Sequence, residues 1–362
     1  MAQIPVTVLT GYLGAGKTTL LNRILSEPHG KKYAVIVNEY GEEGIDGALV
    51  VGADEEVFEM NNGCICCTVR GDLIRVISGL MKRAGSFDGI LVETTGLADP
   101  GPVAQTFFAD EDIAAKAKID SIVAVVDAKH LPLRLKDSKE AEEQIAFADI
   151  ILLNKTDLVG ADELADIERA IRKINSFAKI VRTVKCAAPL DEILGRGSFD
   201  INEILKHEPD FLKPETEHSH DHHHHEHGDH CSHDCGHDHH HHGHKHDHEH
   251  GHEHGHHHRN EIHDSEISSL SLVGDQPLDM AKFESWMSDL RANKGQDLLR
   301  YKGILNIAGQ DRRVAIQGVH MMMDGGNLTP WQAGEARRSR LVFIGRHLDE
   351  QALRDGFARC AA

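Results

Sequence analysis

Three thiols lie within four residues of this chain, at Cys64, Cys66 and Cys67. Thiolate sulfur binds Zn²⁺, Cu⁺ or Co²⁺ far better than side-chain oxygen does. The cysteines follow a turn-forming Met-Asn-Asn-Gly stretch and precede a predicted helix, whose N-terminus favours the deprotonated thiolate. Three protein thiolates leave one position of a tetrahedral site open, which suits a site that passes its ion on. The alternatives are a disulfide between Cys66 and Cys67 and packing cysteines.

A phosphate-binding loop is predicted earlier in the chain, where residues 11–18 read GYLGAGKT. A strand-like run at Val6–Thr10 precedes this loop and a helical pattern at Lys17–Leu25 follows it, which is the context that the motif requires. Backbone N–H groups would wrap the phosphates, Lys17 would add positive charge, and the Thr18 hydroxyl is expected to bind Mg²⁺. The residues of this loop predicted to bind nucleotide are Gly11, Gly14, Ala15, Gly16, Lys17, Thr18 and Thr19.

A second nucleotide motif, Asn-Lys-Thr-Asp at residues 154–157, follows the apolar run Ile150–Leu153. A carboxylate at Asp157 can accept hydrogen bonds from both the ring N–H and the exocyclic amine of guanine, donors that adenine does not present in that arrangement. The motif therefore favours GTP over ATP. The predicted base-binding residues are Asn154, Lys155 and Asp157.

Two acidic residues follow buried strand-like runs and are candidates for phosphate-sensing segments. Glu93 ends the run Ile90–Val92 and is expected to lie near Mg²⁺, while Glu39 follows Ala34–Val37. For Glu39 a plain surface position is the alternative. The predicted catalytic set is Lys17, Thr18, Glu93 and Glu39.

Short apolar runs alternate with helical patterns through the first half of the chain. This alternation predicts an α/β fold, namely a P-loop NTPase domain with a doubly wound, mostly parallel sheet. After the histidine-rich tract, strand patterns at Ile267–Val273, Leu298–Ile307 and Arg313–Val319 surround a helix at Met280–Leu290 and predict a small α+β domain. The expected boundaries are 1–206 for the nucleotide domain, 207–265 for a disordered linker and 266–362 for the C-terminal domain.

The tract between His218 and His258 holds 23 of the chain's 29 histidines. Residues 215–264 also carry 12 Asp and Glu against two basic residues, so 10 of the 19 net negative charges lie there. Such a composition has little apolar surface to stabilise a core. It predicts many weak imidazole metal sites that lose metal below about pH 6, with a solvated spacer as the alternative reading.

The remaining charge and the cysteine usage exclude several classes of protein. No basic patch indicates a nucleic-acid partner, and no apolar run is long enough to span a membrane. Seven cysteines without a disulfide framework indicate a reducing compartment, and no signal peptide is recognisable, so the cytoplasm is expected. Both a monomer and a homo-oligomer are compatible with the sequence.

Taken together, these motifs resemble the CobW-type P-loop GTPases, a metallochaperone family. The matching segments are GYLGAGKTTL at 11–20, NEYGEEGID at 38–46, GCICC at 63–67, ETTGLADP at 93–100, VVDA at 125–128 and NKTD at 154–157. RYKGIL at 300–305, QGV at 317–319, PW at 330–331 and LVFIG at 341–345 resemble the C-terminal domain of that family.

The resemblance implies a GTPase that carries zinc at Cys64, Cys66 and Cys67 and releases it to a client metalloprotein under control of GTP. Cobalt delivery for cobalamin synthesis or for another metalloenzyme is the first alternative. A metal store based on the histidine tract is the second, although the intact Lys17 and Asp157 argue against it. A nickel-insertion GTPase is the third; such proteins would lack the Cys-x-Cys-Cys element.

Overall fold

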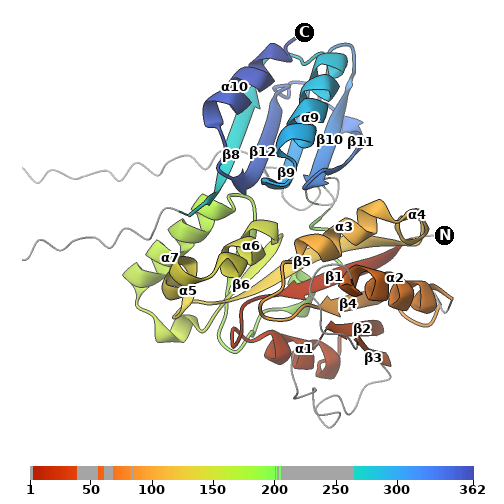
Figure 1. The fold of residues 1–362 in the computed structure, drawn as a ribbon, viewed down its shortest axis with the longest axis vertical. Coiled ribbons are helices and arrows are strands. Elements are labelled where there is room, and N and C mark those ends of the chain that lie inside the picture. Colours follow the sequence, from red (N-terminus) through yellow and green to blue (C-terminus); the bar gives the residue numbers. More distant parts are fainter. Residues whose placement is uncertain are drawn as a thin grey trace, which may run out of the picture. The chain divides into compact units, whose positions relative to one another are not determined.

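The first half of the molecule contains a seven-stranded sheet (Figure 1), most strands of which are rich in β-branched residues. Its strand order is β3-β2-β4-β1-β5-β6-β7, and every neighbouring pair is parallel. The strands are β1 Ile4–Thr10, β2 Tyr33–Asn38, β3 Glu56–Met60, β4 Gly89–Glu93, β5 Ala117–Asp127, β6 Ile150–Asn154 and β7 Lys179–Arg182. The predicted doubly wound parallel fold is confirmed. The apolar runs of the sequence, Ile122–Val126 among them, predict β1, β2, β4, β5 and β6 but neither β3 nor β7.

Alternating strand residues face two separate hydrophobic layers, because successive side chains of a strand point to opposite faces. In β5, Ile122, Ala124 and Val126 pack with helices on one face, whereas Val123 and Val125 pack on the other. The first layer holds α2 (Thr68–Met81), α3 (Gly101–Ala109), α6 (Lys139–Phe147) and α7 (Ala161–Ile174). The second holds α1 (Lys17–Ser26) and the segment around Leu190–Glu192. Two short helices, α4 (Glu111–Ala114) and α5 (Leu131–Asp137), complete this half.

The parallel pairing brings the carboxyl ends of these strands to one edge of the sheet. The chain leaves β1 at Thr10, β3 at Met60, β4 at Glu93 and β6 at Asn154. Motifs that are far apart in the sequence therefore start from the same edge. In open α/β sheets this edge is where ligands bind.

The C-terminal part forms a five-stranded antiparallel sheet of order β11-β10-β9-β12-β8. Helices α9 and α10 lie together on one face of it (Figure 1), where Phe283, Met287 and Phe357 are buried. The three predicted strands and the predicted helix at Met280–Leu290 are confirmed, and β11, which contains two glycines and ends at a proline, was not predicted. The elements are β8 Ile267–Gly274, α9 Met280–Lys294, β9 Leu298–Leu305, β10 Arg312–Val319, β11 Met322–Pro330, β12 Ser339–Arg346 and α10 Glu350–Arg359.

The computed structural model describes residues 3–38, 56–60, 68–82, 85–199, 201, 204 and 265–362. All of them belong to one compact unit, which includes both sheets. The predicted disordered linker, Glu39 and the three clustered cysteines lie outside the described residues. Among the helices described, none combines the length and apolar character that a membrane span needs.

Candidate functional site

The loop between β1 and α1 has a backbone that only glycine can supply at two positions. Gly11 and Gly16 have φ of 141° and 120°. A Cβ on Gly11 would lie 2.2 Å from the Val125 carbonyl oxygen, and one on Gly16 would lie 2.6 Å from Nδ2 of Asn154. The predicted strand, glycine-rich loop and helix are therefore present, with β5 and β6 packed directly against the loop.

Lys17 begins α1 and its side chain is buried under the loop that precedes it. The ammonium donates hydrogen bonds to the carbonyl oxygens of Gly11 at 2.6 Å and Tyr12 at 3.4 Å. Burial lowers the pKa of Lys17, and the negative charge of Glu93 opposes that shift. A poorly solvated cation held at the N-terminus of a helix is suited to bind phosphate.

Asn154 connects the nucleotide motifs to each other. Its Nδ2 donates to the carbonyl of Ala15 at 2.9 Å. Its Oδ1 accepts from the backbone N–H of Cys186 at 2.9 Å and the hydroxyl of Thr183 at 3.2 Å. With 2% of its surface exposed, Asn154 fixes the positions of the surrounding loops.

Lys155 covers the outer part of the phosphate loop. Its ammonium donates to the Gly14 carbonyl at 2.8 Å and to Oδ2 of Asp127 at 2.7 Å. The same carboxylate oxygen lies 2.8 Å from Nδ1 of His130. Burial alone would raise the pKa of Asp127, but hydrogen bonds from Lys155 and His130 outweigh it and lower the pKa overall.

Asp127 and Cys186 are two residues of this site that the sequence analysis did not select. Asp127 ends a buried strand at the same edge as the phosphate loop, and that placement was the available signal. Cys186 had no signal. Its thiol donates to the Gly16 carbonyl at a sulfur–oxygen distance of 3.4 Å, and burial raises its pKa to about 11. Cys186 is therefore a neutral packing group beside the nucleotide loops.

Asp157 lies in a single 3-10 turn, Thr156–Leu158, directly after β6. The side chain of Thr156 anchors this turn through a 3.1 Å hydrogen bond to the carbonyl of Thr183. Asp157 itself is exposed. Its side chain is therefore accessible to a ligand, while the hydrogen bond of Thr156 holds the backbone of the turn.

Glu93 and Thr18 offer oxygen ligands beside Lys17: the Glu93 charge acts on the Lys17 ammonium, and Thr18 is the next residue of α1. Glu93 ends β4 and is 6% exposed, and Thr18 is exposed on the first turn of α1. Carboxylate and hydroxyl oxygens are the ligand types that Mg²⁺ takes in such sites, so the donor set fits this ion. Thr94, the next residue, is held by Leu9, whose carbonyl accepts from both its N–H at 2.9 Å and its hydroxyl at 3.3 Å.

A pocket of about 480 Å³ opens between the phosphate loop, the end of β5 and helices α5 and α6. Its lining includes Tyr12, Gly14, His130, Arg134 and Lys155. The Arg134 guanidinium lies 5.2 Å from the centre of the Tyr12 ring. Each of these basic side chains lies beside a carboxylate: Lys155 and His130 beside Asp127, which also lines the pocket, and Arg134 beside Asp137.

The three clustered cysteines lie outside the described residues, but both of their flanks are described. Strand β3 ends at Met60 and helix α2 begins at Thr68. The segment that contains the thiols therefore leaves the sheet at the same edge as the phosphate loop and Glu93. In the part of the chain that the structure describes, no other group of three His, Cys, Asp or Glu side chains could hold a metal ion.

Comparison with known proteins gives matches to both halves of the chain. Residues 5–182 match the family described as "CobW/HypB/UreG, nucleotide-binding domain", and residues 267–361 match "Cobalamin synthesis protein cobW C-terminal domain". The chain is 33% identical over 363 residues to the "Zinc chaperone YjiA" of Escherichia coli (strain K12), and the alignment covers 99% of both proteins.

Other relatives are similar over different lengths. The "Zinc chaperone CobW" of Pseudomonas aeruginosa is 33% identical over 385 residues, covering 98% of this chain and 90% of that protein. The "Zinc-regulated GTPase metalloprotein activator 1" of Schizosaccharomyces pombe is 45% identical over 187 residues, half of this chain and 46% of its own length.

A solved structure agrees with the fold. The crystal structure of "Zn(II)-bound YjiA GTPase from E. coli" matches over 100% of both chains with a TM-score of 0.73 and 29% identity. The match therefore includes both halves of the chain. The chain belongs to the CobW family of P-loop GTPases.

Proposed function

We propose that this GTPase binds zinc at Cys64, Cys66 and Cys67 and delivers it to a client metalloprotein under control of GTP binding and hydrolysis. The observation that carries the proposal is the common edge of the sheet. The chain leaves β3 for the cysteine segment where β1 and β4 lead into the phosphate loop and Glu93. A change at the nucleotide can therefore reach the thiolates over a short path.

Each nucleotide-site residue has a role in this proposal. The N–H groups of the glycine-rich loop and Lys17 hold the phosphates, Thr18 and Glu93 hold Mg²⁺, and Asp157 recognises guanine. When bound, Mg²⁺ supplies positive charge that neutralises the phosphate oxygens. The full-length relatives named zinc chaperones support zinc as the cargo. Cobalt is the alternative cargo, since thiolates bind it as well.

Two further elements follow from the sequence. The histidine tract would collect zinc through many weak imidazole ligands and would release it below about pH 6. Free thiols at the cysteine site require a reducing compartment, for which the cytoplasm is suited. The client is expected to be a protein with its own, tighter zinc ligands.

The test of this proposal is metal affinity measured with either GDP or a non-hydrolysable GTP analogue bound. Co²⁺ serves as the probe in full-length protein, because thiolate-to-cobalt charge-transfer absorption reports sulfur ligands and ignores imidazole. Cys231 and Cys235 of the histidine tract are changed to serine to remove their signal. We expect about 5- to 150-fold tighter binding with the GTP analogue, the range of typical allosteric coupling.

Linkage provides the internal control for this experiment. If GTP tightens metal binding, metal must tighten GTP binding by the same factor. Changing Cys64, Cys66 and Cys67 to serine should abolish both effects and leave basal GTP binding near normal. Equal metal affinities in the two nucleotide states would refute nucleotide control. Elemental analysis of protein purified from metal-limited cells then decides between the two cargoes, because in vivo loading depends on metal availability and not on affinity alone.

Guanine recognition is tested at Asp157. Asp157→Asn replaces an acceptor by a group that both donates and accepts, so GTP affinity is expected to fall while affinity for xanthosine triphosphate rises. The loss for GTP should reach about 1.5–3 kcal/mol, the typical contribution of a hydrogen bond to a charged group. Binding titrations with GTP, ATP and xanthosine triphosphate measure it. Wild-type protein that bound ATP and GTP equally would contradict the assignment.

A further inference from the structure

Helix α6 contacts the segment that follows Glu93. Gln144, 2% exposed, donates from Nε2 to the carbonyl oxygens of Gly96 at 3.1 Å and Ala98 at 3.3 Å. Gly96 in turn lies against the phosphate loop, because a Cβ there would come within 2.7 Å of the Leu13 side chain. One amide therefore fixes the path of residues 96–98 next to the nucleotide site.

The same helix is tied to the C-terminal sheet at several points. Glu143 forms an ion pair with Arg346 of β12. The carbonyl of Phe147 accepts a hydrogen bond from Arg300 of β9. Near the start of the helix, Lys139 pairs with Glu266 at 3.0 Å. Helix α6 therefore cannot shift without moving or breaking contacts to the C-terminal sheet.

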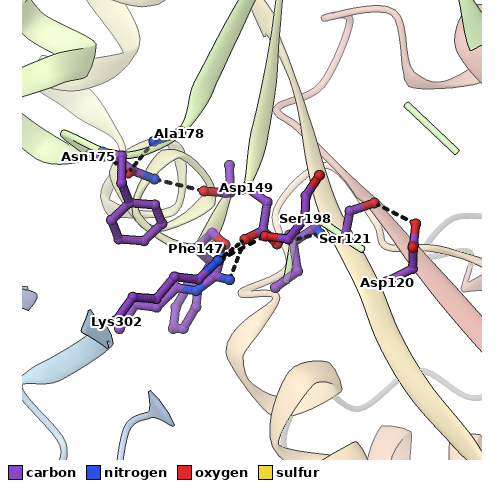
Figure 2. Close-up of polar contacts among 12 residues, drawn as sticks. Asp120, Ser121, Phe147, Asp149, Asn175, Ala178, Ser198 and Lys302 are labelled. Atoms are coloured by element: carbon purple, nitrogen blue, oxygen red, sulfur yellow. Dashed lines mark hydrogen bonds and ion pairs between the residues drawn. The ribbon is translucent and has the colours of Figure 1, made fainter. Parts of the chain in front are cut away.

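Directly after α6, a buried carboxylate adds a stronger link (Figure 2). Oδ1 of Asp149 accepts from Arg300 at 2.5 Å and from Lys302 at 2.8 Å, and Lys302 also donates to the Ser198 carbonyl at 2.9 Å. The side chains of Asp149, Arg300 and Lys302 are each 1% exposed. Buried charges of opposite sign hold a fixed geometry, because separating the carboxylate from the two cations would leave them desolvated and unpaired.

Arg346 also acts on the far end of the segment that Gln144 holds. Burial raises the pKa of Glu143, Asp99 raises it further, and the positive charge of Arg346 counters both. Burial likewise raises the pKa of Asp99, and a hydrogen bond from the Gly101 N–H and the positive charge of Arg346 oppose that rise. One guanidinium from the C-terminal sheet therefore offsets the charge of two carboxylates, one on α6 and one just beyond residues 96–98.

His320, in the turn between β10 and β11, also contacts α6. The ring of His320 lies 5.4 Å from that of Phe147. A Cβ on Gly101 would lie 3.0 Å from both of these rings and from Oδ1 of Asp99. The start of α3 is thus enclosed by α6 and the C-terminal domain together.

We propose that α6 transmits the state of the C-terminal domain to residues 96–98, and that Gln144 is a positioning residue for GTP hydrolysis. A partner that binds the C-terminal domain and moves it relative to α6 would thereby change the rate of hydrolysis. The inference depends on the GTPase activity and is independent of metal delivery. It assigns the C-terminal domain a regulatory role in addition to any part it plays in client binding.

The test is steady-state GTP hydrolysis by the full chain with Mg²⁺ and without zinc, so that failure of the zinc proposal leaves it intact. Gln144→Met keeps the size of the side chain and removes the donor. Arg346→Gln removes the charge on the C-terminal side. Each is expected to lower kcat about 2- to 30-fold with KM for GTP unchanged, the range found for residues along such networks.

The double variant separates coupling from independent damage. Because Arg346 is proposed to act through α6, the Gln144→Met, Arg346→Gln protein should hydrolyse GTP no more slowly than Gln144→Met alone. Arg354→Gln is the matched control and should behave as wild type, since Arg354 belongs to the C-terminal domain and its ion pair among the described residues is with Glu350 of its own helix. Wild-type kcat in Arg346→Gln, multiplying effects in the double variant, or an effect on KM alone would overturn the proposal.

Thermal unfolding of every variant accompanies the kinetics. If Gln144→Met does not fold, Gln144→Asn replaces it, because the shorter amide keeps its polarity but cannot reach both carbonyls. The same pattern of kcat loss and absent additivity is then expected. A Gln144→Asn protein with wild-type kcat would count against Gln144 as a positioning residue.

Discussion

Lys17→Ala is expected to reduce kcat for GTP hydrolysis by about 10²–10³-fold, the typical effect of removing one preorganised group that stabilises developing charge. The ammonium is already held at the phosphate loop by the carbonyls of Gly11 and Tyr12, so its position is set before the phosphate binds. Nucleotide affinity should fall as well, because the charge also acts in the ground state. Hydrolysis assays and GTP binding titrations measure the two effects.

Removing the Lys17 charge should not lower the stability of the nucleotide-free protein and is expected to raise it or leave it unchanged. Burial lowers the pKa of Lys17, so the folded state disfavours its charged form, and this costs stability at every pH below the lowered pKa. Lys17→Met, which keeps the bulk without the charge, should therefore unfold at an equal or higher urea concentration than wild type. Lys116→Ala at an exposed lysine is the control for both assays. A Lys17→Met protein that kept full hydrolysis would rule out the phosphate role.

Asp149→Asn is expected to lower the free energy of unfolding by about 3–5 kcal/mol, the cost of removing one partner from a buried ion pair. Two cations, Arg300 and Lys302, face this carboxylate at 1% exposure. Burial lowers the pKa of Arg300, and the negative charge of Asp149 opposes that shift. Without the carboxylate both cations stay desolvated and repel each other. Urea unfolding followed by circular dichroism provides the measurement.

Two further variants test whether the loss of stability comes from the burial of these charges. Asp166→Asn removes an acidic residue whose pair with Arg169 is exposed, and it should change stability by less than about 1 kcal/mol. Replacing Asp149 by leucine together with Arg300 and Lys302 by methionine should recover most of the loss, because buried charge triads are often replaceable by packed apolar groups. If Asp149→Asn were as mild as Asp166→Asn, the triad would not be buried in solution.

The strands that carry the nucleotide motifs could be predicted from the sequence because each is a short apolar run bounded by a glycine or polar turn. Strand β3, in contrast, contains two glutamates in five residues, and β7 begins and ends with a basic residue. Their pattern does not differ from that of a loop. They are strands because neighbouring strands in the sheet provide hydrogen bonds to them, which is a tertiary effect.

The polar contacts between the two sheets could not be predicted for a related reason. Arg300 and Lys302 alternate with apolar residues in β9, a pattern typical of a strand with one face in water. The structure instead buries that face against Asp149, Phe177 and Phe199. Alternation identifies the two faces of a strand but does not tell what covers each one. The motif at residues 154–157 predicts that Asn154 lies near the nucleotide. Its hydrogen bonds to Ala15 and Cys186 could not be predicted, because they join segments far apart in the sequence.

The hydrogen bonds that Asn154 and Cys186 make to the phosphate loop join segments that are synthesised at different times. The hydrogen bond from Asn154 to Ala15 spans 139 residues of sequence, and that from Cys186 to Gly16 spans 170. A ribosome makes the phosphate loop almost first, yet the groups that hold it in shape are made much later. A nascent chain that ends before β6 therefore lacks the side chains that support the loop, and we expect tight GTP binding only after the chain has been made as far as Cys186.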